Sequence, residues 1–167
     1  MNQYTDRLSI LITDLFEVSK ANSGNIDLEY SDINIIEFME QVCAENEELL
    51  QAKNLQLVTN LPEKEIHVCL DGNKTYRIFE NLFTNISKYA LENTRVFLDV
   101  KDIGNSVMII MKNTSKEPLD FDSDITERFV RGDKSRHEAG SGLGLAIVKS
   151  FTEVQNGTFM IETDGDL

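Results

Sequence analysis

Several residue types that would point to particular classes of protein are scarce in this chain. It has no tryptophan, two prolines and two cysteines, and its 29 acidic residues outnumber 16 basic ones, which gives a formal net charge of −13. Cys43 and Cys69 are too few and too far apart for a disulfide framework or a zinc site, which favours a reduced, cytoplasmic setting. The negative charge argues against general binding to nucleic acid or anionic membranes, because both require a positive surface.

Long apolar runs are also missing. No stretch is long enough to cross a bilayer and no signal peptide is visible, so we expect no membrane contact by this chain. Its 167 residues suffice for one domain with a core and a short appendage.

The first periodic segment is an amphipathic helix over residues 4–20. Its apolar positions recur at helical spacing: Leu8, Leu11, Ile12, Leu15 and Val18. Two interpretations stay open from this segment alone. The helix either docks on the domain's own core or forms half of an intermolecular helical bundle.

The remaining pattern predicts strands and helices in alternation. Asn34 and Glu37 have the spacing of a capping box, which places a helix from there to about residue 53. Other helices are expected over 73–91 and from Gly144 to about 155, and strands over 26–33, 55–59, 66–70, 95–100, 106–112 and 158–163. We therefore expect an α/β sandwich, in which a mixed sheet is covered by three helices on one face and preceded by an N-terminal helix.

The helix over 73–91 carries a polar stripe beside its apolar one. Arg77, Asn81, Asn85 and Lys88 follow one another at intervals of four, four and three residues, away from the apolar stripe of Phe79, Leu82, Phe83, Ile86 and Ala90. A carboxamide oxygen suits Mg²⁺, and a lysine suits a phosphate. An ordinary solvated helix face is the alternative.

A glycine-rich segment stands directly before the helix that begins near residue 144. Gly140, Gly142 and Gly144 let the backbone approach a ligand closely, and the free N–H groups of the helix start favour an anion. The spacing differs from the P-loop and from the Rossmann fingerprint. The preceding loop, residues 114–140, concentrates Arg128, Arg131, Lys134 and Arg136, which suggests a basic lid over phosphates rather than a plain charged loop.

These segments together resemble the catalytic and ATP-binding domain of a bacterial sensor histidine kinase. The stretch "NLFTNISKY" at 81–89 resembles the family's N-box, "ERFVRGD" at 127–133 its F-box, and "GSGLGLAIVKSFTEVQNG" from Gly140 its second glycine box. The stretch "RLSILITDLFEVSKANSGNIDL" resembles the second helix of the dimerisation and phosphotransfer hairpin. The resemblance implies a boundary near residue 25, with the hairpin helix and linker in 1–25 and the ATP-binding domain in 26–167.

The resemblance implies ATP and Mg²⁺ as cofactors and assigns roles by position. Asn85 would coordinate Mg²⁺, Asn81 would lie near the ion, and Lys88 and Arg131 would contact the phosphates. The implied nucleotide-binding set is completed by Tyr89, Asn113, Ser115, Gly140, Ser141, Gly142, Leu143 and Gly144. Phe129 would pack the lid.

Two departures from the family pattern stand out. The first glycine box, normally D-x-G-x-G, falls at residues 113–117, where Asn113 replaces the adenine-binding Asp and both glycines are missing. Neither His67 nor His137 lies in an acceptor motif, so we expect this chain to be a fragment without the phosphoacceptor histidine.

The resemblance further implies a response regulator as partner of the intact protein, pairing with a second kinase chain through the complete hairpin, and a membrane-anchored parent protein. One alternative is a catalytically degenerate nucleotide-binding module. The other is an ATPase of the gyrase or chaperone branch, which Asn81 disfavours because that branch carries a catalytic Glu there.

Overall fold

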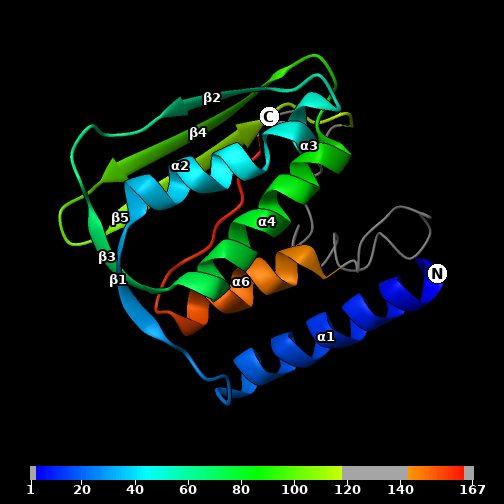
Figure 1. Cartoon of the computed structure of the whole chain (residues 1–167), viewed down its shortest axis with the longest axis vertical. Helices are drawn as coiled ribbons and strands as arrows, with labels where there is room; N and C mark the ends of the chain where they lie inside the picture. Colours follow the sequence, from blue (N-terminus) through cyan, green and yellow to red (C-terminus); the bar gives the residue numbers. More distant parts are fainter. Residues whose placement is uncertain (1–2, 118–142, 164–167) are drawn as a thin grey trace. The chain divides into compact units, whose positions relative to one another are not determined.

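The computed structural model describes residues 3–117 and 143–163, and Figure 1 follows the chain through them. These residues divide into two compact units. The first contains α1, residues 73–82 of α4, and α6, and the second contains all the described strands, α2, α3 and the last part of α4. Each unit is treated by itself below.

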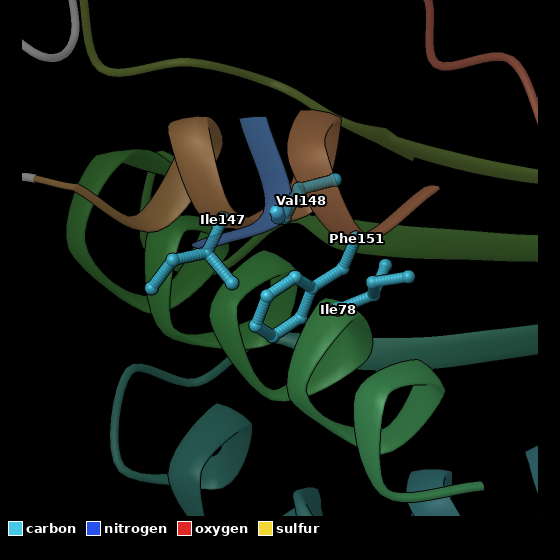
Figure 2. Close-up of a cluster of buried hydrophobic side chains, with 5 residues drawn as sticks. Ile78, Ile147, Val148 and Phe151 are labelled. Atoms are coloured by element: carbon cyan, nitrogen blue, oxygen red, sulfur yellow. The ribbon is translucent and has the colours of Figure 1, made fainter. Parts of the chain in front are cut away.

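The first unit is a cluster of helices. Helix α1 (Gln3–Ser23) contacts α6 (Gly144–Val154), and residues 73–82 belong to α4 (Gly72–Tyr89). Ile78 of α4 packs with three side chains of α6 in the core of this unit, as Figure 2 shows. The buried members are Ala21, Ile78, Ile147, Val148 and Phe151. The core thus forms where the periodic apolar positions of α6 meet those of α4.

The two residues Asn156 and Gly157 terminate the chain path of helix α6 in different ways. Asn156 takes the left-handed conformation with φ of 65°, and the N–H of Gly157 donates to the Thr152 carbonyl at 2.9 Å. A Cβ at position 157 would lie 2.9 Å from Cγ2 of Thr152, so this close approach requires glycine. The helix end predicted at these two residues is confirmed.

The second unit holds the strands. β1 (Tyr30–Asn34) pairs antiparallel with β3 (His67–Asp71). β2 (Gln56–Asn60) pairs parallel with β4 (Arg95–Asp102), and β4 pairs antiparallel with β5 (Val107–Asn113). Helix α2 (Ile35–Glu45) contacts β1, and α3 (Glu47–Gln51) contacts β2. The α/β class and the mixed sheet are confirmed, although the described strands form two sheets rather than one.

The helix expected from Asn34 to about residue 53 is in fact two helices. Asn34 caps the first, since its Oδ1 accepts the N–H of Ile36 at 3.2 Å. The break lies at Asn46, whose buried side chain donates to the Val42 carbonyl at 2.8 Å. A side chain that bonds the carbonyl four residues earlier competes with the regular ladder, and the helix restarts after it.

The strand expected over residues 158–163 does not form. The structure describes these residues, and they pair with no described strand. Phe159 packs against the core of the first unit, whereas Met160 is 71% exposed. The alternating pattern therefore reflects an extended segment that packs on one side, which the sequence alone does not distinguish from a paired strand. By contrast, the strands expected over 95–100 and 106–112 form and are joined by a turn, with Gly104 at φ of +102°.

One charged cluster on β1 and β3 gives a pH prediction. Nδ1 of His67 lies 3.2 Å from Asp32, and Nε2 lies 3.2 Å from Glu65. The hydrogen bond to Glu65 and the charge of Asp32 raise the pKa of His67 above its ordinary 6.5. Because the folded-state pKa is the higher one, the stabilising effect is complete below about 6.5 and disappears as the pH rises through the folded-state value.

We expect NMR titration of the His67 ring to give a midpoint above 6.5, and the double variant Asp32→Asn/Glu65→Gln to lower it toward that value. The exposed Glu63→Gln change serves as a control, since Glu63 is not one of the His67 partners. A midpoint that stays unchanged in the double variant would contradict the pairing.

Candidate functional site

Helix α4 has the two faces that its sequence predicts. Phe79, Phe83 and Ile86 are buried, at 6%, 0% and 7% exposure. Asn85 and Lys88 are only half-buried. The apolar side thus anchors the helix, and Asn81, Asn85 and Lys88 of the polar stripe stay partly accessible along the other side.

The two asparagines of this stripe differ in their surroundings. The side-chain nitrogen of Asn81 donates to the Arg77 carbonyl at 2.7 Å, which fixes the orientation of the carboxamide. Within the described residues, the carboxamide of Asn85 makes no such bond. Of the two, Asn85 therefore has the whole carboxamide available for a ligand, while Asn81 offers only its oxygen.

The end of α4 is joined directly to the segment that follows β5. The N–H of Leu91 donates to the Thr114 carbonyl at 2.7 Å, and the N–H of Lys116 donates to the Tyr89 carbonyl at 2.9 Å. Ala90 and Ser115 form an antiparallel bridge between these two bonds. We call this pairing of residues 89–91 with 114–116 the α4–β5 seam.

The seam brings together predicted site residues that are far apart in the sequence. Tyr89 and Ser115 lie on its two sides, and Asn113 is the last residue of β5, just before it. All three side chains are half-buried. Residues 114–116, where the glycines of the family pattern are missing, thus follow a defined path beside the end of α4.

The start of α6 carries the last described part of the predicted phosphate site. Gly144 is its first residue, and Leu143 precedes it without a side-chain cap. The first N–H groups of a helix have no partner within the helix. Such groups favour an anion at a helix start. Leu143, Gly144 and Asn81 belong to the first unit, and Asn85, Lys88, Tyr89, Asn113 and Ser115 belong to the second.

The other predicted residues fall outside the described part of the chain. These are Arg128, Phe129, Arg131, Lys134, Arg136, His137, Gly140, Ser141 and Gly142. Their assigned roles stay predictions.

The described residues are better suited to a metal ion that binds together with a nucleotide than to a permanently bound metal. The described residues hold no group of three His, Cys, Asp or Glu side chains that could bind a metal. Mg²⁺ typically takes one or two protein ligands and completes its shell with phosphate oxygens and water. The accessible carboxamide of Asn85 suits that arrangement.

Among the described residues, Cys43 and His67 have surroundings that do not activate a nucleophile. Burial, and secondarily the charge of Glu40, raises the pKa of Cys43 to about 11, so its thiol stays protonated at neutral pH. His67 is exposed on β3 between two carboxylates. Neither is placed as a reactive group.

The sequence of residues 70–166 matches the model of a known family, described as "Histidine kinase-, DNA gyrase B-, and HSP90-like ATPase". The chain belongs to this family. The match includes α4, the seam, the glycine segment and α6.

The proteins and solved structures similar to this chain include several histidine kinases. The sensor protein kinase WalK of Staphylococcus aureus is 34% identical over 160 residues, which are 92% of this chain and 38% of that protein. The fold is similar to that of the Acinetobacter baumannii histidine kinase AdeS, with a TM-score of 0.76, 17% identity, and coverage of 97% of this chain and 75% of AdeS. Full-length ShkA in complex with AMPPNP gives a TM-score of 0.73 at 20% identity, over 90% of this chain and 32% of ShkA.

The chain spans 26–38% of the length of the curated WalK sequences that it matches. Among the described residues, no helix has both the length and the apolar content needed to cross a membrane.

The sequence analysis missed two acidic residues of α1. Asp14 is buried at 4% exposure, and its carboxylate accepts a hydrogen bond from Arg77 at 2.6 Å, with Glu17 close by. The available signal was their spacing of three residues, which puts both acids on one face of the helix.

We expect Asn85→Ala to weaken binding of Mg²⁺–ATP by about tenfold, or ~1.4 kcal/mol, because a metal ligand is lost. The fold should stay intact, since Asn85 lies off the buried face of α4. Isothermal titration calorimetry measures the affinity, and circular dichroism checks the fold. Unfolding of the variant would show that Asn85 is a structural residue.

We expect Asn113→Asp to tighten ATP binding by about fivefold, or ~1 kcal/mol, because a hydrogen bond to a carboxylate is about twice as strong as a neutral one. Selectivity over GTP should rise as well, since guanine has a carbonyl where adenine has its amino group. Competition binding measures both effects. Unchanged affinity and selectivity would mean that Asn113 does not face the base.

Proposed function

We propose that this chain is the ATP-binding catalytic domain of a two-component sensor histidine kinase. In this proposal it transfers the γ-phosphoryl group of ATP to a histidine outside residues 1–167, from which the group passes to a response regulator. The observation that carries the proposal is the α4–β5 seam, which bonds the Tyr89 carbonyl to Lys116 and pairs Ala90 with Ser115. Tyr89 lies about one turn after Asn85 in α4. The family match and the similarity to WalK support this assignment.

The chemistry rests on positioning and charge neutralisation. Lys88 contacts a phosphate through its ammonium group, Asn85 holds the ion that comes with the nucleotide, and Tyr89 and Asn113 hold the nucleoside. Mg²⁺ neutralises phosphate charge when it is bound. The proposed phosphate contacts also include Arg131, Gly140, Ser141, Gly142, Leu143 and Gly144.

The proposal extends to the whole protein of which this sequence is a part. Helix α1 is assigned to the dimerisation hairpin, through which a second kinase chain pairs, and the parent protein is membrane-anchored. The exposed apolar residues of α1 support the hairpin assignment: Leu8, Ile12 and Leu15 are 52%, 59% and 57% exposed. A helix docked through this stripe would have buried them.

A degenerate nucleotide-binding module is the second candidate function. The observation that favours it is the sequence of residues 113–117, which lacks the family's Asp and both glycines. Against it stands the half-buried Asn85 on the polar stripe, whose carboxamide a purely structural nucleotide does not require.

We expect this chain alone to bind Mg²⁺–ATP without labelling itself from ATP labelled at the γ-phosphate, because neither histidine lies in an acceptor context. A fusion that places the acceptor helix of WalK ahead of α1 should label on the added histidine. The label should be acid-labile and base-stable, as a phosphoramidate is. The same fusion carrying Asn85→Ala is the matched control and should label weakly.

Three other outcomes would decide against parts of this proposal. Absence of nucleotide binding at millimolar ATP would remove the nucleotide function altogether. Labelling of the unfused chain on His137 would mean that the acceptor is internal. A fusion that binds ATP and dimerises but never labels would favour the binding module.

A further inference from the structure

Helix α1 attaches to the first unit by a side that leaves most of its apolar stripe exposed. The apolar side chains of its first half are exposed, with Ile12 at 59% and Leu15 at 57%. The side chain of Asp14 lies between them in sequence and is only 6% exposed. A helix that buries a carboxylate and leaves its apolar stripe in solvent needs a specific partner for that carboxylate.

The partner is Arg77 of α4. One terminal nitrogen of its guanidinium, Nη2, donates to Oδ1 of Asp14 at 2.6 Å, and the other, Nη1, lies 3.4 Å from Oε2 of Glu17. That Glu17 oxygen is buried and accepts no hydrogen bond among the described residues, so its contact with Arg77 is one of charge alone. The arginine and glutamate side chains are themselves 30% and 25% exposed.

The rest of the described α1 attachment is made with α6 and the core cluster of this unit. Ala21 is buried in the core cluster, Val18 packs at its margin, and the hydroxyl of Ser150 in α6 donates to Asn22 at 3.0 Å. Two short apolar side chains bury little area compared with the leucines and phenylalanine left exposed on the other side. The ion-pair cluster is the part of the α1 attachment whose geometry is specific, because it needs opposite charges at fixed positions.

We propose that Arg77 is a positioning residue that latches α1 to the helix carrying Asn81 and Asn85. The latch consists of Asp14, Glu17 and Arg77. It holds α1 by its acidic residues and leaves most of its apolar side chains exposed, so that α1 can contact another helix while it stays attached to α4. The functional consequence rests on the proposed function: if α1 is the hairpin helix and α4 binds the nucleotide, the latch determines how the two helices are held together.

Arginine is required for this geometry because two acids on successive turns of α1 face one side chain. The two ends of the guanidinium reach one carboxylate each, whereas a lysine ammonium is a single point charge on a flexible stem. Arg77 also lies one turn before Asn81 in α4, and its backbone carbonyl accepts a hydrogen bond from the Asn81 side chain at 2.7 Å. The latch and the candidate site therefore share the same stretch of backbone.

Amide hydrogen exchange of the full 167-residue chain, without nucleotide, tests the latch. A helix of this length that loses its docking partner is marginal in water, so release of α1 should show as faster exchange of its amides. We expect Arg77→Gln to raise the exchange rate of the Glu17–Lys20 amides by about tenfold or more, because a buried carboxylate is left without its partner. Arg77→Lys should give an intermediate rate.

The double variant Asp14→Asn/Arg77→Gln separates a pairing from a general loss of packing. Removing both partners removes the uncompensated charge, so the double variant should exchange more slowly than Arg77→Gln alone. Asp6→Asn, the same chemical change at an exposed position of α1, is the matched control and should leave exchange unchanged. Should Arg77→Gln fail to fold, Asp14→Asn and Glu17→Gln test the same contacts singly.

Nucleotide titration of Arg77→Gln distinguishes positioning from binding. We expect its ATP affinity to stay within about threefold of wild type while α1 is released. Unchanged α1 exchange in Arg77→Gln, or a double variant no slower than the single one, would overturn the latch. A large loss of ATP affinity would make Arg77 a binding residue instead. If the wild-type chain binds no ATP, the proposed function fails, whereas the exchange results still decide the latch.

Discussion

Helix α4 has to bury one side completely and keep the other available for a ligand, and the described site depends on that division. Phe83 and Ile86 supply the buried side, at 0% and 7% exposure, while Asn85 stays half-buried on the other. Asparagine is a mediocre helix former, so the packing of the apolar side has to stabilise a helix that its polar stripe weakens. A loss of packing at Phe83 would therefore displace Asn85 and Lys88 together, although Phe83 itself touches no ligand.

The α4–β5 seam carries this constraint into a region where the sequence departs most from its family. Glycines in a binding loop give the backbone freedom to approach a ligand. Here the same stretch runs as a short antiparallel pairing, with Ala90 opposite Ser115. Backbone pairing restricts the path of the chain more than a glycine loop does. A base that binds beside Asn113 would therefore contact a segment that is already ordered. If the base binds beside Asn113 as proposed, preorganisation of this kind lowers the entropic cost of binding and would offset part of the weaker hydrogen bond of a neutral side chain.

The sequence predicted those parts of the molecule in which a residue's role depends on its near neighbours. The two faces of α4, the cap at Asn34 and the helix end at Asn156 all follow from spacings of one to four residues. The break at Asn46 was missed because a side-chain bond to Val42 competes with a helix that the apolar pattern favours throughout. The missing strand over 158–163 depends on whether a partner strand is present, which alternation does not report. The seam and the latch join residues far apart in the chain, and no local pattern encodes such pairs.

Helix α1 shows why apolar pattern and docking face can disagree. The exposed side chains of Leu8, Ile12 and Leu15 are costly in water, and a helix that served only its own domain would turn them inward. A buried pair such as Asp14 and Arg77 adds little net stability over an apolar contact of the same size, because both charges are desolvated. The pair makes the attachment specific, because the contact is favourable only when α1 lies at the position along α4 that brings Asp14 to Arg77. An attachment that is weak in energy but strict in register suits a helix that has to be held in place while its other face binds elsewhere.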